Sequence, residues 1–168
     1  MQQTKFKIVL LGDARCGKTT FVQLVSKGKF TEDYAATRGV EITPVSVKTS
    51  LGIFTLEMWD CAGNRTYRSP VECCKNSDAA IIFFDASRPE TEGNFLNQHL
   101  SSFRAVDETA PIFVCKNKID LNNSTDQDAQ RMLVYSRYEL ISCKTNRNCR
   151  SLLLDLLQTL VDPKLKLC

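Results

Sequence analysis

The sequence predicts an α/β fold: a six-stranded, mostly parallel sheet with one antiparallel edge strand and helices on both faces. Short, almost wholly apolar runs alternate along the chain with longer segments in which apolar residues recur at helical spacing. Strands that are apolar on both sides are typical of parallel sheets covered by helices. Such alternation implies right-handed crossover connections between the strands.

Six segments have the composition of strands. They lie at 6–11, 40–49, 53–60, 79–85, 111–116 and 138–142. The second and third alternate between apolar and polar residues and are separated by Ser50, Leu51 and Gly52, which predicts a β-hairpin. Pro44 has no N–H group to donate to a neighbouring strand, so its strand is expected at the edge of the sheet.

The segments between these strands have helical spacing. Helices are expected at 18–28, 92–106, 126–137 and 149–161. Gly28 is suited to end the first helix, and Thr125 or Asp126 to cap the third. The last helix is the most apolar, so it is expected to pack against the sheet.

The 168 residues predict a single domain spanning 1–168, since no repeat, low-complexity tract or linker divides them. The composition, with 43% hydrophobic and 24% charged residues, is that of a soluble globular protein. A net charge of +3 with scattered basic residues does not favour nucleic acid as a partner. No apolar run approaches the roughly 18 residues of a membrane span.

The eight cysteines lack the spacing of a metal site, and a single histidine cannot complete a zinc site of the usual kind. The N-terminal residues lead directly into the first strand, which leaves no room for a signal peptide. We therefore expect reduced thiols and a location in the cytoplasm or nucleus, with a secreted, disulfide-bonded protein as the alternative.

A phosphate-binding loop is predicted between the first strand and the first helix. The stretch GDARCGKT fits the pattern G-x-x-x-x-G-K-S/T and lies between a strand and a helix, which is the context the pattern needs. Its backbone N–H groups and the helix N-terminus attract phosphate, Lys18 can reach the β and γ phosphates, and Thr19 can bind Mg²⁺. The alternative is a glycine-rich turn that fits by accident. The predicted contact residues are Gly12, Asp13, Ala14, Arg15, Cys16, Gly17, Lys18 and Thr19.

The sequence NKID, which follows the strand at 111–116, predicts selection of guanine. Asp120 can accept hydrogen bonds from the paired N–H donors of guanine, which adenine lacks, and such sites discriminate strongly. Lys118 is expected to lie along the base and Asn117 to tie this loop to the phosphate loop. Alone, the four residues would also fit a surface turn.

Three further elements complete the predicted site. Asp60 is placed to hold Mg²⁺ through water, and Gly63 can offer its N–H to a γ-phosphate. The hydroxyl of Thr37, in the loop before the edge strand, can complete the metal shell. After the last strand, backbone N–H groups of Ser142, Cys143 and Lys144 can meet the guanine carbonyl. Thus Thr19, Thr37 and Asp60 form the expected metal site.

These elements, in this order, resemble those of the Ras-superfamily small GTPases, which have a P-loop fold, over nearly the whole chain. Within the superfamily, the resemblance is closest to the Ran family of nuclear-transport GTPases, in KFKIVLLGDARCGKTTFV, ATRGVEITPV, WDCAGN, AAIIFFDAS and LVDPKL. It implies a monomeric switch that binds GTP or GDP with Mg²⁺ and signals through segments 34–42 and 62–77 to exchange factors, activating proteins and transport-type effectors. It also implies nucleotide contacts by Thr20, Phe30 and Tyr34, without nucleic-acid binding or membrane insertion.

The chain departs from this superfamily where its members carry the glutamine that orients the attacking water, because it has Asn64 there. The asparagine amide is one methylene, roughly 1.5 Å, shorter, and a misplacement near 1 Å can cost about a hundredfold in rate. We therefore predict slow GTP hydrolysis by Asn64, Lys18 and Thr37. Arg15 is expected to point to solvent rather than to act as a built-in arginine finger, and Ala14 to crowd an arginine from an activating protein.

Two other functions remain open at this point. The chain can be a module that holds GTP without turnover, or a nucleotide kinase, although no arginine-rich lid is visible. A Rab-like trafficking GTPase is a further alternative to the Ran type. The segment 120–128 lacks the glycine and glutamate of a calcium loop. His99 and Trp59 are expected to have surface or packing roles, and Cys168 to be an unmodified thiol.

Overall fold

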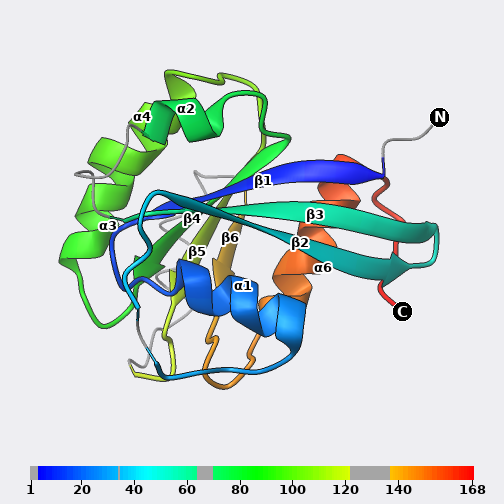
Figure 1. Ribbon diagram of the computed structural model, residues 1–168, viewed down its shortest axis with the longest axis horizontal. Helices are drawn as coiled ribbons and strands as arrows, with labels where there is room; N and C mark the ends of the chain where they lie inside the picture. The colour runs from blue at the N-terminus through cyan, green and yellow to red at the C-terminus, as the bar shows by residue number, and fades with distance from the viewer. Residues whose placement is uncertain (1–3, 34, 64–69, 122–136) are drawn as a thin grey trace.

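A computed structural model describes residues 4–33, 35–63, 70–121 and 137–168 (Figure 1). These residues form a six-stranded sheet in the order β2-β3-β1-β4-β5-β6, in which β2 and β3 are antiparallel and all other neighbours are parallel. The strands are β1 (Lys5–Gly12), β2 (Val40–Thr49), β3 (Gly52–Cys61), β4 (Ala79–Asp85), β5 (Ile112–Asn117) and β6 (Tyr138–Leu140). The predicted fold class is confirmed.

The β2–β3 hairpin lies at one edge of the sheet, where the sequence predicts it. Pro44 pairs with Glu57 of β3 and is on the outermost strand, so its missing N–H removes no bond to a second neighbour. Thr49 faces Gly52 across the turn. The strand β6 is shorter than the predicted segment 138–142 and ends at Leu140.

The helices are distributed over both faces of the sheet (Figure 1). They are α1 (Lys18–Lys27), α2 (Pro70–Cys74), α3 (Glu90–Asn94), the π-helix η2 (Phe95–Leu100), α4 (Ser101–Arg104) and α6 (Cys149–Leu160). The single α-helix predicted at 92–106 is wrong in detail, because the helical segment starts at Glu90 and has a π-helical middle. Sequence patterns do not distinguish i→i+5 from i→i+4 hydrogen bonding. The helix predicted at 126–137 lies outside the described residues, and α2 was not predicted.

The sheet separates two clusters of buried hydrophobic side chains, one on each face. Ile8 and Leu10 of β1 point into one cluster with α1 and α6, whereas Val9 and Leu11 point into the other with Cys74 and with the helices after β4. This alternation follows from the two-residue period of a strand. All residues of β4 and β5 are buried, as predicted for strands covered on both faces.

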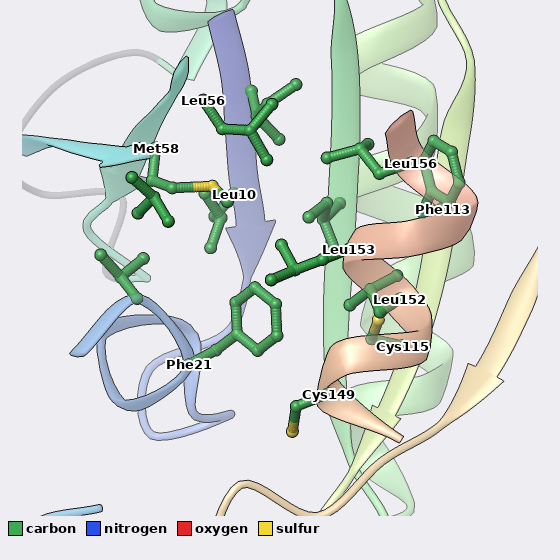
Figure 2. Close-up of a cluster of buried hydrophobic side chains, with 14 of the residues drawn as sticks. Leu10, Phe21, Leu56, Met58, Phe113, Cys115, Cys149, Leu152, Leu153 and Leu156 are labelled. Atoms are coloured by element: carbon green, nitrogen blue, oxygen red, sulfur yellow. The ribbon is translucent and has the colours of Figure 1, made fainter. Parts of the chain in front are cut away.

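Helix α6 packs against the sheet beside α1, which confirms the prediction for the most apolar helix. Figure 2 shows Phe21 from α1 and Leu153 from α6 pointing toward each other next to Leu10 of β1. Gly28 ends α1 in the left-handed conformation, with φ 69°, and its N–H donates to the carbonyl of Leu24 at 2.8 Å.

The residues after α6 return to the β2–β3 hairpin. Leu165 is fully buried in the cluster below the sheet, and Leu167 forms a bridge with Thr49. The N–H of Ser50 donates to the carbonyl of Lys166 at 2.9 Å, and the N–H of Cys168 donates to the carbonyl of Lys48 at 3.0 Å. The last residues thereby attach α6 to the turn of the hairpin (Figure 1).

Among the residues that the structure describes, no helix is both long enough and apolar enough to cross a membrane. All eight cysteines are free thiols, seven of them buried.

Candidate functional site

The loop between β1 and α1 has a backbone that two glycines make possible. Gly12 has φ 133°, and a Cβ atom there would collide with the carbonyl oxygen of Phe83 in β4. Gly17 has φ 95°, and a Cβ atom would collide with the side-chain amide of Asn117. Other residues rarely adopt such angles. The loop therefore needs glycine at both positions, as the phosphate-loop pattern requires.

The outward carbonyl groups of this loop are bound by side chains. Lys18 is buried, and its ammonium donates to the carbonyls of Gly12 at 2.7 Å and Asp13 at 2.9 Å. Burial lowers the pKa of Lys18, while the charge of Asp60 opposes that shift. A phosphate placed beside the ammonium would favour its charged form, so the position of Lys18 suits an anion.

Asn117 ties its own loop to the phosphate loop, as predicted, and it also contacts the loop after β6. Its side-chain nitrogen donates to the carbonyl of Cys16 at 2.9 Å, and its side-chain oxygen accepts from the N–H of Cys143 at 3.2 Å. The side chain is 1% exposed, so both bonds are shielded from water. One residue thus fixes the spacing between two loops that are far apart in the sequence.

Asp120 and Ser142 are held together at the other end of the site. The hydroxyl of Ser142 donates to the Asp120 carboxylate at 2.6 Å, and its own N–H donates to the carbonyl of Arg147 at 3.1 Å. The N–H groups of Ser142 and Cys143, expected to meet a guanine carbonyl, are therefore already paired within the protein. A base at this edge would have to share these two donors.

Three oxygen-bearing side chains meet below the phosphate loop, as predicted for a metal site. The Thr19 hydroxyl donates to the Asp60 carboxylate at 2.5 Å and lies 2.9 Å from the Thr37 hydroxyl. The other Asp60 oxygen is buried and, among the described residues, has no hydrogen-bond partner. Burial raises the pKa of Asp60, against the hydrogen bond from Thr19 and the charge of Lys18.

A divalent cation fits this group. Mg²⁺ prefers hard oxygen ligands. Two hydroxyls lie beside the Asp60 carboxylate, one oxygen of which has no partner among the residues that the structure describes. A nearby cation would also favour the ionised carboxylate, which burial disfavours. Thr19, Thr37 and Asp60 therefore suit the role assigned to them from the sequence.

These elements surround a pocket of about 660 Å³. Its predicted lining residues include Phe30, Gly63 and Asp120 as well as the inner residues of the phosphate loop. The full set of predicted residues that line it is Ala14, Arg15, Gly17, Lys18, Thr19, Thr20, Phe30, Thr37, Gly63, Asn117, Lys118, Asp120, Cys143 and Lys144. Gly12, Asp13, Cys16, Asp60 and Ser142 are not in the lining and act as supports, through the contacts given above and below. Asn64 and Tyr34 lie outside the described residues.

Four lining residues were not predicted from the sequence, namely Thr31, Glu32, Ala36 and Leu121. Leu121 is 61% exposed, and it directly follows Asp120. Adjacency to predicted contacts is the one signal that would have found it.

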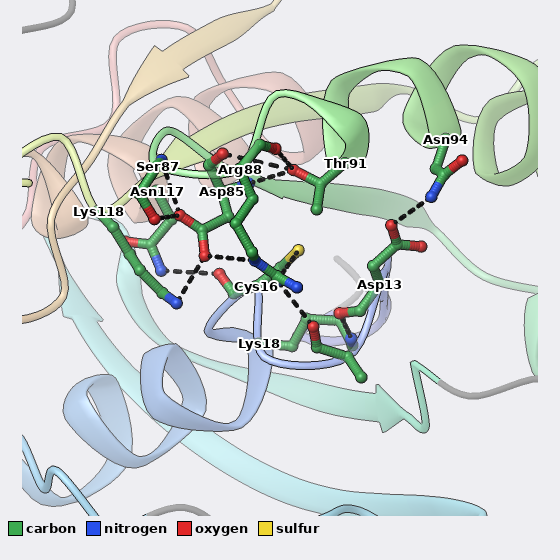
Figure 3. A network of polar contacts seen from close by, with 11 residues as sticks. Asp13, Cys16, Lys18, Asp85, Ser87, Arg88, Thr91, Asn94, Asn117 and Lys118 are labelled. Carbon is green, nitrogen blue, oxygen red and sulfur yellow. Dashed lines mark hydrogen bonds and ion pairs between the residues drawn. The ribbon is translucent and has the colours of Figure 1, made fainter. Parts of the chain in front are cut away.

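A cluster of charged residues behind the phosphate loop was also missed (Figure 3). Asp85 ends β4 and accepts from Lys118 at 2.7 Å and from the Arg88 Nε at 3.1 Å. The Nη2 of Arg88 donates to the carbonyl of Ala14 at 2.8 Å. Lys118, which is expected to lie along the base, lines the pocket, and its ammonium is paired with this carboxylate. We call Asp85, Arg88 and Lys118 the Asp85 cluster.

His99 has a more specific contact than the expected surface or packing role. It is buried, and its Nε2 lies 2.8 Å from the Asp13 carboxylate, which also accepts from Asn94 at 2.8 Å. Burial alone would raise the pKa of Asp13, but the hydrogen bonds from Asn94 and His99 outweigh it and lower the pKa. The phosphate loop is therefore also attached to α3 and η2.

The fold and the pocket are those of a P-loop nucleotide-binding domain, with phosphate, base and metal elements at the carboxyl edge of the sheet. A family model described as "Ras of Complex, Roc, domain of DAPkinase" matches residues 7–120. Because this match covers more than half of the chain, the protein belongs to the Roc family, a branch of the Ras-like GTPases. It is accordingly a GTP-binding switch domain of the Ras superfamily, a class that binds guanine nucleotides and regulatory proteins and hydrolyses GTP.

Proposed function

We propose that this chain is a Ran-like molecular switch that binds GTP or GDP with Mg²⁺ and hydrolyses GTP slowly. The observation that carries the proposal is the single pocket shared by the phosphate loop, Asn117, Asp120, Thr37 and Gly63. The proposal takes the whole chain, 1–168, as one domain.

In this proposal, backbone N–H groups of the loop and the Lys18 ammonium bind the phosphates, and Asp120 selects guanine. Thr19, Thr37 and Asp60 hold Mg²⁺, which would offset phosphate charge when bound. The contact between Thr37 and Thr19 supports a switch, since a loop that reaches the metal shell can be released when the γ-phosphate is lost. The closeness of Gly63 to the backbone of Asp13 and Ala14 supports a second contact between this segment and the phosphate loop.

Slow hydrolysis is proposed because Asn64 has a shorter side chain than the glutamine of related enzymes. The measurement is single-turnover hydrolysis of GTP by the parent and by Asn64→Gln. The longer side chain is expected to raise the rate about tenfold or more, since about 1 Å of misplacement is worth up to a hundredfold. Equal rates for the two proteins would show that Asn64 does not limit turnover.

Ran-type partners are proposed from the quoted sequence segments, with a location in the cytoplasm or nucleus. The eight free thiols support a reducing compartment. Binding to immobilised nuclear-transport receptors in the presence of GTP but not of GDP would support the partners. Binding instead to trafficking effectors would favour the Rab-like alternative.

A second function, holding GTP without turnover, is favoured by Asn64 together with Ala14, because a methyl group in the phosphate loop crowds an arginine supplied in trans. Hydrolysis that stays undetectable with and without an activating protein would establish it.

Calorimetric titration with GDP, GTP and ADP, each with and without Mg²⁺, tests the pocket directly. We expect tight binding of GDP and GTP that weakens without Mg²⁺, and at least a roughly 10⁴-fold preference over ADP. Equal binding of ADP would remove the role assigned to Asp120.

A further inference from the structure

The Asp85 cluster connects the two halves of the pocket. Lys118 belongs to the segment that faces the base, whereas Ala14 belongs to the phosphate loop, and Arg88 reaches Ala14 from the start of the connection to α3 (Figure 3). Both cations share the same Asp85 oxygen. A displacement of either cation therefore changes the environment of the other.

Asp85 is built to stay charged and fixed. Its side chain is 1% exposed, and its second oxygen accepts from the N–H of Ser87 at 2.9 Å and from the Ser87 hydroxyl at 2.7 Å. Burial alone would raise the pKa of Asp85, but the bonds from Lys118, Ser87 and Arg88 lower it. A buried carboxylate with this many donors is a rigid anchor, because moving it would leave a charge without partners.

Arg88 supplies the donor to the Ala14 carbonyl of the phosphate loop. Four carbonyls of the loop accept hydrogen bonds from side chains, and backbone carbonyls shielded from water need such partners. Lys18 binds those of Gly12 and Asp13, Asn117 binds that of Cys16, and Arg88 binds that of Ala14. Among these donors, Arg88 alone comes from outside the predicted nucleotide motifs.

We propose that Arg88 is a positioning residue for nucleotide binding, which is held by Asp85 and in turn holds the phosphate loop at Ala14. The inference rests on the proposed function and names a residue that the phosphate-loop and guanine motifs do not include. Its guanidinium is suited to this task, since its planar fork donates in two fixed directions at once, whereas a lysine ammonium acts as a point charge. Arg88 is thus specific to the phosphate part of the ligand.

The test compares the affinities for GDP and GMP of the parent and of Arg88→Met. The methionine keeps an unbranched stem of similar length and removes the donors. Losing a charge-assisted bond to the loop is expected to weaken GDP binding about tenfold or more. GMP lacks the β-phosphate that the loop cradles, so its affinity is expected to change less than about threefold by the same reasoning.

The control is Arg104→Met. Arg104 also binds backbone carbonyls, with Nη1 2.8 Å from the carbonyl of Ala110, but it lies outside the pocket. Its replacement is expected to lower the melting temperature without changing either affinity.

Arg88→Lys distinguishes a loss of stability from a loss of loop positioning. A lysine can keep the ion pair with Asp85 but cannot donate to Asp85 and to the Ala14 carbonyl in two fixed directions. It is expected to regain the melting temperature of the parent without regaining GDP affinity.

Equal losses of GDP and GMP affinity in Arg88→Met, or GDP affinity within twofold of the parent, would overturn the proposal. Full recovery of GDP affinity in Arg88→Lys would also overturn it. A parent protein that binds no guanine nucleotide would overturn the proposed function and this inference with it. A parent that binds GDP tightly, with an unaffected Arg88→Met variant, would overturn the inference alone.

Discussion

Replacing Asn117 with alanine tests the idea that one buried side chain sets the distance between the phosphate loop and the loop after β6. The change leaves two buried groups, the carbonyl of Cys16 and the N–H of Cys143, without the partners they have at 2.9 and 3.2 Å. A buried group left unsatisfied costs about 1–3 kcal/mol, so two cost about 2–6 kcal/mol of unfolding free energy. Natural domains have only about 5–15 kcal/mol in total.

The measurement is urea unfolding without nucleotide, followed by GDP titration of the same samples. We expect a lower unfolding midpoint with an unchanged slope, and GDP affinity reduced by at least about tenfold, because the loops are no longer held at the spacing that the ligand needs. The matched control is Gln158→Ala, which removes an amide that donates to the carbonyl of Leu165 at 2.9 Å, far from the pocket. It is expected to cost about 1 kcal/mol or less and to leave GDP affinity unchanged. An Asn117→Ala variant within about 0.5 kcal/mol of the parent would refute the reasoning.

Three further predictions concern the phosphate loop and the metal site. Gly12→Ala is expected to cost about 3 kcal/mol or more, since its Cβ would meet backbone, whereas Gly28→Ala, with a similar sign of φ but open space around it, should cost about 1 kcal/mol in thermal unfolding. The pKa of Asp13 is lower in the folded protein than in the unfolded chain, so the ionised carboxylate stabilises the fold. This stabilisation is fully present above the unfolded pKa and is lost as the pH falls through the folded pKa. Asp13→Asn should therefore flatten the decline in urea midpoint below about pH 4, and an unchanged slope there would contradict the assignment. Removing Mg²⁺ with a chelator should speed GDP release roughly tenfold or more in the parent and little in Asp60→Asn. The release rate is followed with a fluorescent GDP analogue. Equal acceleration in both proteins would exclude Asp60 from the metal site.

The antiparallel edge strand and the main pocket residues could be predicted because each rests on a local rule. Pro44 cannot sit in the middle of a sheet, and the phosphate loop needs glycine at Gly12 and Gly17 for reasons of backbone geometry. These constraints act over a few residues, so a single sequence displays them.

The Asp85 cluster and the contact between His99 and Asp13 could not be predicted in the same way. Both depend on contacts between residues 33 to 86 positions apart, and neither belongs to a short pattern. One signal was present, since Asp85 is a charged residue at the carboxyl end of a strand that is otherwise wholly apolar. A buried carboxylate at that edge needs cations nearby, and Arg88 follows three residues later.

The attachment of the chain's last residues to the hairpin turn has a practical consequence for spectroscopy. Cys168 is the exposed thiol among the eight, and it lies beside Lys48, at the end of the sheet away from the phosphate loop (Figure 1). A maleimide dye would therefore attach at one site without blocking the pocket. Because β2 leads from that turn toward Thr37, such a dye would report whether nucleotide exchange shifts the hairpin along the sheet or leaves it in place.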